Sequence, residues 1–158
     1  MLALVLETGL RPTDVAYLQL SQVDWQSGLI ALTGGVQRQW LLCGERSLAA
    51  LQRYAHEERA SVRPQLFLQQ GKPFTVSALT RWAADLGERA GVGRISWQTL
   101  RDTFTAVCTQ NGLDLAALHR DVQGLGRAAG YHSALDFFAL QTRISGCGPL
   151  AGLRPAEA

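Results

Sequence analysis

Arginine side chains are the residues of this sequence best suited to binding an anion. Lys72 is the only lysine among its 15 basic Lys and Arg residues, so all the others are arginines. The planar guanidinium fork can donate two parallel hydrogen bonds to one phosphate, which an ammonium group cannot do. A GC-rich genome would produce the same preference through codon usage, and this is the stronger explanation of the bias. The formal net charge of +2 permits nucleic-acid binding but does not by itself indicate it.

Other reactive side chains lack the spacing of a catalytic or metal site. His56 and His119 stand alone in the sequence, and no Ser-His-Asp or Cys-His arrangement can be inferred. The cysteines are odd in number and widely spaced, at Cys43, Cys108 and Cys147. This pattern indicates small buried side chains rather than disulfides or zinc ligands. We therefore expect no metal ion and no cofactor.

Length and composition indicate one globular domain. The chain has 158 residues, of which 47% are hydrophobic, enough to build a core. No apolar run approaches the roughly 18 to 20 residues of a membrane-spanning helix, and Glu7 interrupts the N-terminal run too early for a signal peptide. We expect a soluble, cytoplasmic protein without membrane contact. Its domain should cover residues 1–144, followed by a loose tail over residues 145–158.

Hydrophobic periodicity predicts a mainly α-helical domain with a small antiparallel β-sheet. Apolar segments at residues 28–32 and 40–42 flank a glycine pair and predict a β-hairpin, and a third short strand is expected near residues 66–68. The glycine-rich stretch 123–130 is expected to be irregular. Helices are expected at residues 1–9, 13–20, 45–60, 75–90, 96–110, 113–122 and 133–141.

Two short boxes, each containing an arginine, carry the sharpest signal. They read ETGLRPTDV (Glu7–Val15) and LRDTF (Leu100–Phe104), with NGLDL (Asn111–Leu115) downstream. Between them, GKPFT (Gly71–Thr75) leads into the helix end LGERAGV (Leu86–Val92). In this order and separation, the segments resemble the catalytic domain of the tyrosine recombinases, the phage-integrase family, over about residues 1–122. The resemblance implies that family's mainly α fold and a function in DNA integration or recombination.

The resemblance implies that Arg11 and Arg101 hold the non-bridging oxygens of a DNA phosphodiester while a tyrosine attacks it. Negative charge grows on these oxygens in the transition state, and fixed guanidinium donors stabilise it. Asp14 would brace Arg11 by a carboxylate contact, or serve only the first turn of its helix. Without the resemblance, the two arginines would be explained as a surface residue at a turn and a helix-face ion pair.

The other catalytic positions depart from the family pattern. Gln98 stands three residues before Arg101, where the family commonly has histidine. Glutamine can hydrogen-bond a phosphate from that helix face, but it cannot transfer a proton. The hairpin turn at residues 33–38 lacks the family's lysine, and Arg38 could contact DNA there but is a poor proton donor. Trp97 is expected to lie in the core.

The family's C-terminal Leu-Gly-His motif can be placed in three registers. They put Gly124, Arg127 or His132 at the histidine position, and none brings a tyrosine to the nucleophile position. Tyr131, the only tyrosine in the C-terminal half, is either a displaced nucleophile or, with more weight, a packing anchor. His132 is a phosphate contact or an ordinary exposed histidine. Arg127 is a further candidate for DNA contact.

Three functions remain open at this point. The leading one is a recombinase-like domain with an incomplete active site, which binds double-stranded DNA without cutting it. The second is an active site-specific recombinase that uses Tyr131 as its nucleophile. The third is a protein-interaction module, in which residues 143–158 dock on another copy or on a paralogous recombinase subunit. The chain is either a fragment of a longer recombinase or a stand-alone protein.

Overall fold

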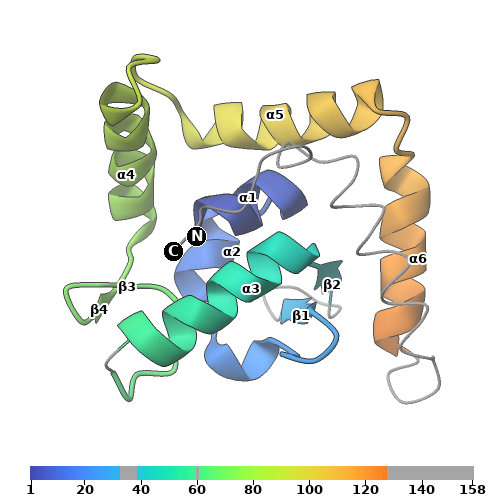
Figure 1. Ribbon diagram of the computed structural model, residues 1–158, viewed down its shortest axis with the longest axis horizontal. Helices are drawn as coiled ribbons and strands as arrows, with labels where there is room; N and C mark the ends of the chain where they lie inside the picture. Colours follow the sequence, from blue (N-terminus) through green and yellow to red (C-terminus); the bar gives the residue numbers. More distant parts are fainter. Residues whose placement is uncertain (33–38, 60, 128–158) are drawn as a thin grey trace.

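The fold is mainly helical, with two small antiparallel sheets, which confirms the predicted class (Figure 1). The structure is a computed structural model, and it describes residues 1–32, 39–59 and 61–127. The predicted helix at residues 133–141 and the predicted tail lie outside the described residues. None of the described helices is both long and apolar enough to cross a membrane.

The elements follow the predicted order. The helices are α1 (Leu2–Thr8), α2 (Pro12–Tyr17), α3 (Glu45–Arg53), α4 (Val76–Arg89), α5 (Trp97–Gln110) and α6 (Leu115–Arg127). Two short turns join them, the 3-10 turn η1 (Leu20–Gln22) and the π-helical turn η2 (Tyr54–Glu58). The strands are β1 (Leu29–Leu32), β2 (Gln39–Leu42), β3 (Leu68–Gln69) and β4 (Lys72–Pro73).

The two sheets are separate hairpins. In the first, Leu29 lies opposite Leu42, so β1 and β2 form the predicted hairpin. The third strand exists as β3, but it pairs with β4 and does not extend the first sheet. Gln70 and Gly71 have positive φ angles of 52° and 75°, which close this second hairpin into a tight turn.

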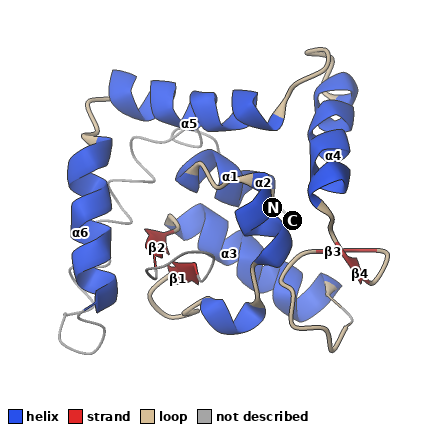
Figure 2. Cartoon of the chain, turned by 180° about the vertical axis from the view of Figure 1, so that it is seen from behind, coloured by secondary structure: helices blue, strands red, loops and turns tan. Residues whose placement is uncertain are grey.

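Three long helices enclose the rest of the described chain. Figures 1 and 2 show α4, α5 and α6 as three sides of a frame around α1, α2, α3 and the first hairpin. The local sequence determines where α4 and α5 begin. The hydroxyls of Thr75 and Ser96 cap these helices, because each accepts a hydrogen bond from the backbone amide three residues further along the chain, at 3.1 and 3.0 Å. Within the frame, α5 lies on α1, and α6 lies on β2.

The core has two parts. The larger part lies among α1, α2, α3 and α4 and includes Leu4, Val15, Leu51 and Leu79. The smaller part lies between the first hairpin and the helices α5 and α6. Its buried members are Leu29, Leu42, Cys108, Leu113, Leu118 and Val122. The Arg11 turn, between α1 and α2, is therefore supported by the larger part of the core.

Cys43 and Cys108 are buried, as the sequence predicted, and Cys147 lies outside the described residues. The Cys43 thiol donates a hydrogen bond to the carbonyl of Gly28 at 3.1 Å. Burial, with a smaller contribution from the carboxylate of Glu7, raises the pKa of this thiol to about 12. Cys43 is thus a packing residue rather than a reactive one.

Two helix ends differ from the prediction because of contacts with distant segments. Helix α2 ends at Tyr17 rather than near residue 20, since Leu18 is extended and its carbonyl accepts from the amide of Leu66 at 2.7 Å. Helix α6 continues to Arg127 through the stretch predicted to be irregular. There Gln123 is buried and pairs with the backbone of β2, a contact that offsets the flexibility of the neighbouring glycines.

Candidate phosphate-binding site

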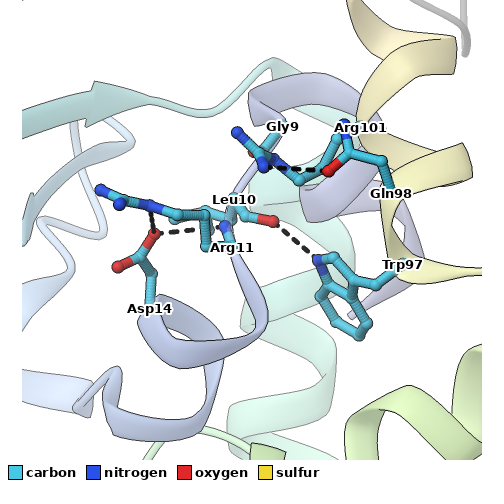
Figure 3. A network of polar contacts seen from close by, with 7 residues as sticks. All are labelled: Gly9, Leu10, Arg11, Asp14, Trp97, Gln98 and Arg101. Carbon is cyan, nitrogen blue, oxygen red and sulfur yellow. Dashed lines mark hydrogen bonds and ion pairs between the residues drawn. The ribbon is translucent and has the colours of Figure 1, made fainter.

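A tight turn between α1 and α2 presents Arg11 (Figure 3). Gly9 follows the end of α1 in a left-handed conformation, with φ of 64°, and a Cβ there would lie 2.9 Å from the ring of Phe104. Both the backbone angle and the space therefore favour glycine. Leu10 is buried, whereas Arg11 is exposed. The turn is anchored inward by one side chain and presents the next one to solvent.

Asp14 holds Arg11 at two points. Its Oδ2 atom accepts a hydrogen bond from the Arg11 backbone amide at 3.2 Å and another from Arg11 Nε at 3.3 Å. The carboxylate therefore serves both the first turn of α2 and the guanidinium, the two roles that the sequence left open. The Arg11 side chain is 59% exposed, and its terminal Nη groups bond to no other described residue. This leaves two N–H donor groups facing solvent.

Helix α5 binds the same turn through two side-chain hydrogen bonds. Arg101 Nε donates to the carbonyl of Gly9 at 2.9 Å, and Trp97 Nε1 donates to the carbonyl of Leu10 at 2.8 Å. The partners are 92 and 87 residues apart along the chain. Two consecutive carbonyls are thereby fixed by one helix, so the position of Arg11 depends on α5.

Trp97 does more than the sequence indicated. It is buried, as predicted, and its ring centroid lies 6.1 Å from that of Trp82. Its bond to the turn was not foreseen. The available signal was general: a buried tryptophan N–H usually finds an acceptor, and Trp97 stands one helical turn before Arg101.

Gln98 links Arg101 to a carboxylate. Its Oε1 accepts from Arg101 Nη1 at 3.4 Å, and its Nε2 donates to Asp102 Oδ1 at 2.7 Å. Figure 3 shows the Arg11 and Arg101 side chains extending to the same side of the turn, away from Trp97. The result is a pair of guanidinium groups, each held through Nε, and Arg101 also donates from Nη1 to Gln98.

This arrangement can bind an anion. Guanidinium groups fixed at one edge lose little conformational freedom when the free edge bonds to a phosphate, and such charged bonds are stronger than neutral ones. Neither an arginine nor the Gln98 amide exchanges a proton near neutral pH, so these three side chains are suited to binding rather than to proton transfer. The two guanidinium groups are therefore suited to bind an anion such as phosphate.

A buried carboxylate lies behind the turn. Glu7 is 1% exposed, and its two carboxylate oxygens make no hydrogen bond of normal geometry with the described residues. Burial raises the pKa of Glu7, although the Ser47 hydroxyl and the amides of Gly44 and Ser47 face it and lower the pKa in part. Glu7 thus meets the N-terminal end of α3 and connects the arginine turn to that helix. Its place in an apolar run gave no sign of this contact.

The predicted site residues fall into two groups. Those that the structure brings together at the turn are Arg11, Asp14, Gln98 and Arg101. Arg38, Tyr131 and His132 lie outside the described residues. Arg127 is the last residue of α6, and its side chain is also outside the described part. The roles in DNA binding and catalysis remain predictions for all of them.

The helical frame with its short hairpin and arginine turn is the fold of tyrosine recombinases. The structure is similar to a crystal structure of XerA recombinase, with a TM-score of 0.64 and 24% identity over 89% of this chain and 50% of that one. It is also similar to the Tn1549 transposon integrase in complex with transposon right end DNA, with a TM-score of 0.61 and 18% identity, covering 88% and 52% of the two chains. These similarities establish the fold.

The sequence profile of the phage integrase family matches residues 1–123, and the chain belongs to that family. It is 31% identical over 123 residues to tyrosine recombinase XerD of Neisseria meningitidis serogroup A, covering 73% of this chain and 42% of the relative. It is 28% identical over 152 residues to tyrosine recombinase XerC of Chlamydia caviae, covering 92% and 46%. The chain thus spans about half the length of these relatives.

Proposed function

We propose that this domain binds double-stranded DNA through its phosphates, with Arg11 and Arg101 as the principal contacts, and that it does so without cleaving the strand. The observation that carries the proposal is the double grip of α5 on the Arg11 turn, at 2.9 and 2.8 Å. It brings Arg101 to the same side of the turn as the exposed Arg11 (Figure 3). The known relatives support DNA as the source of the phosphate, since one integrase of this fold is in complex with transposon DNA.

The proposal of binding without cleavage is supported by Gln98. Both ends of its amide are engaged, with Arg101 and Asp102, so its place in the site is that of a neutral bridge. A neutral amide can bond to a phosphate but cannot shuttle a proton to or from an attacking or leaving oxygen. Arginine at the hairpin would likewise add positive charge without a proton to transfer.

The test is DNA binding by the double variant Arg11→Ala, Arg101→Ala. Fluorescence anisotropy with a labelled duplex of mixed sequence would give the dissociation constant at several salt concentrations. Each phosphate contact contributes about 0.9 to the slope of log affinity against log salt. We expect weaker binding and a slope shallower by about 2, since two contacts are lost.

The matched control removes two arginines elsewhere, in the variant Arg53→Ala, Arg89→Ala. Both side chains are exposed, on α3 and α4, and neither belongs to the turn. The two double variants carry the same net charge, so a general charge effect would lower the slope equally in both. Equal affinity of the Arg11 and Arg101 double variant and the unsubstituted chain would refute the proposal.

Cleavage is tested separately with a nicked suicide substrate. The proposal predicts DNA binding with no covalent protein–DNA adduct on a denaturing gel. An adduct that disappears in Tyr131→Phe would show instead that the domain is an active recombinase with a displaced nucleophile. The full-length relatives XerD and XerC provide positive controls for the substrate.

A further inference from the structure

An open groove begins at Arg11 and runs along the exposed side of α2. Its volume is about 580 Å³, within the range of roughly 300 to 1,000 Å³ that ligand sites occupy. Thr13, Tyr17 and Gln19 line it from α2 and the segment after it, while Leu32 and Gln65 line it from β1 and the segment before β3. Sequence motifs drew attention to none of these positions except those in the first arginine box.

The walls of the groove are held by backbone contacts. The carbonyl of Leu18 accepts from the amide of Leu66 at 2.7 Å, and the amide of Leu20 donates to the carbonyl of Pro64 at 2.9 Å. Gln22 joins a third segment, because its side chain donates to the carbonyl of Ala31 at 2.7 Å. Three segments far apart in sequence are thereby fixed together. The groove is preformed, so a ligand need not order it on binding.

The charges and donors of the groove suit an anionic strand. Among the described residues that line it, Asp14 is the only acid, and it is paired with Arg11. The remaining polar groups are hydroxyls and amides, which commonly contact phosphate and sugar in protein–DNA complexes. The groove therefore offers neutral donors next to one fixed cation.

Tyr17 is the most unusual of these residues. It is 74% exposed, which makes it one of the few large hydrophobic side chains that are exposed in the described part of the chain. An aromatic ring with a hydroxyl at its tip combines a flat apolar face with a hydrogen-bond donor, the combination enriched at binding surfaces. Tyr17 stands one helical turn after Thr13, so both side chains face the groove from α2.

We propose that the sugar–phosphate backbone of a bound DNA strand continues from Arg11 along this groove, where Tyr17, Thr13 and Gln19 contact it. This inference rests on the proposed function and assigns a path to the strand. The contacts are to the backbone, so they add affinity and position the strand without reading its sequence.

The test is the variant Tyr17→Ala, with Tyr17→Phe beside it. We expect Tyr17→Ala to weaken binding of the mixed-sequence duplex about tenfold and Tyr17→Phe about threefold, since only the hydroxyl bond is lost in the second. A neutral contact releases no counterion, so the slope of log affinity against log salt should stay unchanged in both. Val92→Ala, at another exposed apolar side chain that does not line the groove, is the matched control.

The outcomes separate this inference from the proposed function. If Tyr17→Ala binds as tightly as the unsubstituted chain while the Arg11 and Arg101 double variant binds weakly, the groove path is wrong and DNA binding stands. If the Arg11 and Arg101 double variant keeps its affinity for DNA, the proposed function is wrong, and the groove path that rests on it is wrong as well. If Tyr17→Ala changes the preference of the domain among duplexes of different sequence, Tyr17 contacts the bases rather than the sugar–phosphate backbone. If light scattering shows that the unsubstituted chain self-associates and that Tyr17→Ala does not, with DNA affinity unchanged, the groove binds a protein partner instead of DNA.

Discussion

Two helices of the outer frame reach distant backbone groups with polar side chains, and they do so differently. Helix α5 uses Trp97 and Arg101, which both donate to carbonyls of the Arg11 turn. Helix α6 uses Gln123, whose Oε1 accepts from the Trp40 amide at 3.2 Å and whose Nε2 donates to the Trp40 carbonyl at 2.7 Å. The first contact joins a helix to a turn, and the second joins a helix to the edge of a hairpin.

The difference lies in what each contact leaves unused. The amide of Gln123 is buried, and its oxygen and nitrogen are both matched by one backbone residue, as in an added strand. Arg101, in contrast, uses Nε for the turn and keeps guanidinium donors near the surface. A polar contact that satisfies both partners serves stability alone. One that holds a charged group by a single edge also prepares it for a ligand.

The largest expected effect comes from breaking the contact that serves stability. Gln123→Met keeps the length of the side chain but removes both bonds to β2, and it should lower the free energy of unfolding by about 2–3 kcal/mol. Urea unfolding followed by circular dichroism measures this loss. The folded variant should bind DNA with an unchanged salt slope, because no phosphate contact is altered. A shallower slope would place α6 in the DNA interface and remove the distinction.

Local features of this fold could be predicted from the sequence, whereas contacts between distant segments could not. Helix starts at Thr75 and Ser96 were predictable because their hydroxyls cap the chain locally. The two arginine boxes were recognisable as sequence motifs. The end of α6 was predicted wrongly, because glycine content is a local signal, whereas the bond from Gln123 to Trp40 spans 83 residues. The hydrogen bond of Trp97 was missed for the same reason, since it depends on how α5 crosses the turn.

A smaller effect is expected from Trp97→Phe, which keeps an aromatic ring but removes the N–H donor to Leu10. The free energy of unfolding should fall by about 1–2 kcal/mol, from one lost bond and a slightly smaller ring. DNA affinity of the folded variant should fall a few-fold, because the turn that holds Arg11 is less fixed.

A double-mutant cycle with Arg11→Ala tests whether Trp97 acts through that arginine. The effect of Trp97→Phe on affinity should vanish once Arg11 is absent, although the loss of stability should persist. Equal losses of affinity in both backgrounds would mean that Trp97 supports the fold in general and has no particular role at the turn.

The smallest effect should come from Glu7→Gln, which changes only the charge of a buried side chain behind the same turn. Burial raises the pKa of Glu7 above its usual value of 4.5, so the folded protein holds this proton more tightly than the unfolded chain does. The stability that Glu7 contributes is therefore fully present below pH 4.5 and is lost as the pH rises through the raised pKa of the folded state.

Glutamine cannot ionise, and this fixes the sign of the expected difference. Near neutral pH, Glu7→Gln should be more stable than the unsubstituted chain in urea unfolding, and the two should converge as the pH falls below 4.5. Glu88→Gln, which removes an exposed carboxylate on α4, is the matched control. A less stable Glu7→Gln at neutral pH would mean that the amides at the start of α3 stabilise the ionised carboxylate more than burial disfavours it. In that case the turn would have a charged carboxylate on its inner side as well as charged guanidinium donors on its outer side. Contacts that serve stability and contacts that prepare a group for a ligand could then no longer be told apart in this region by whether they leave a charge.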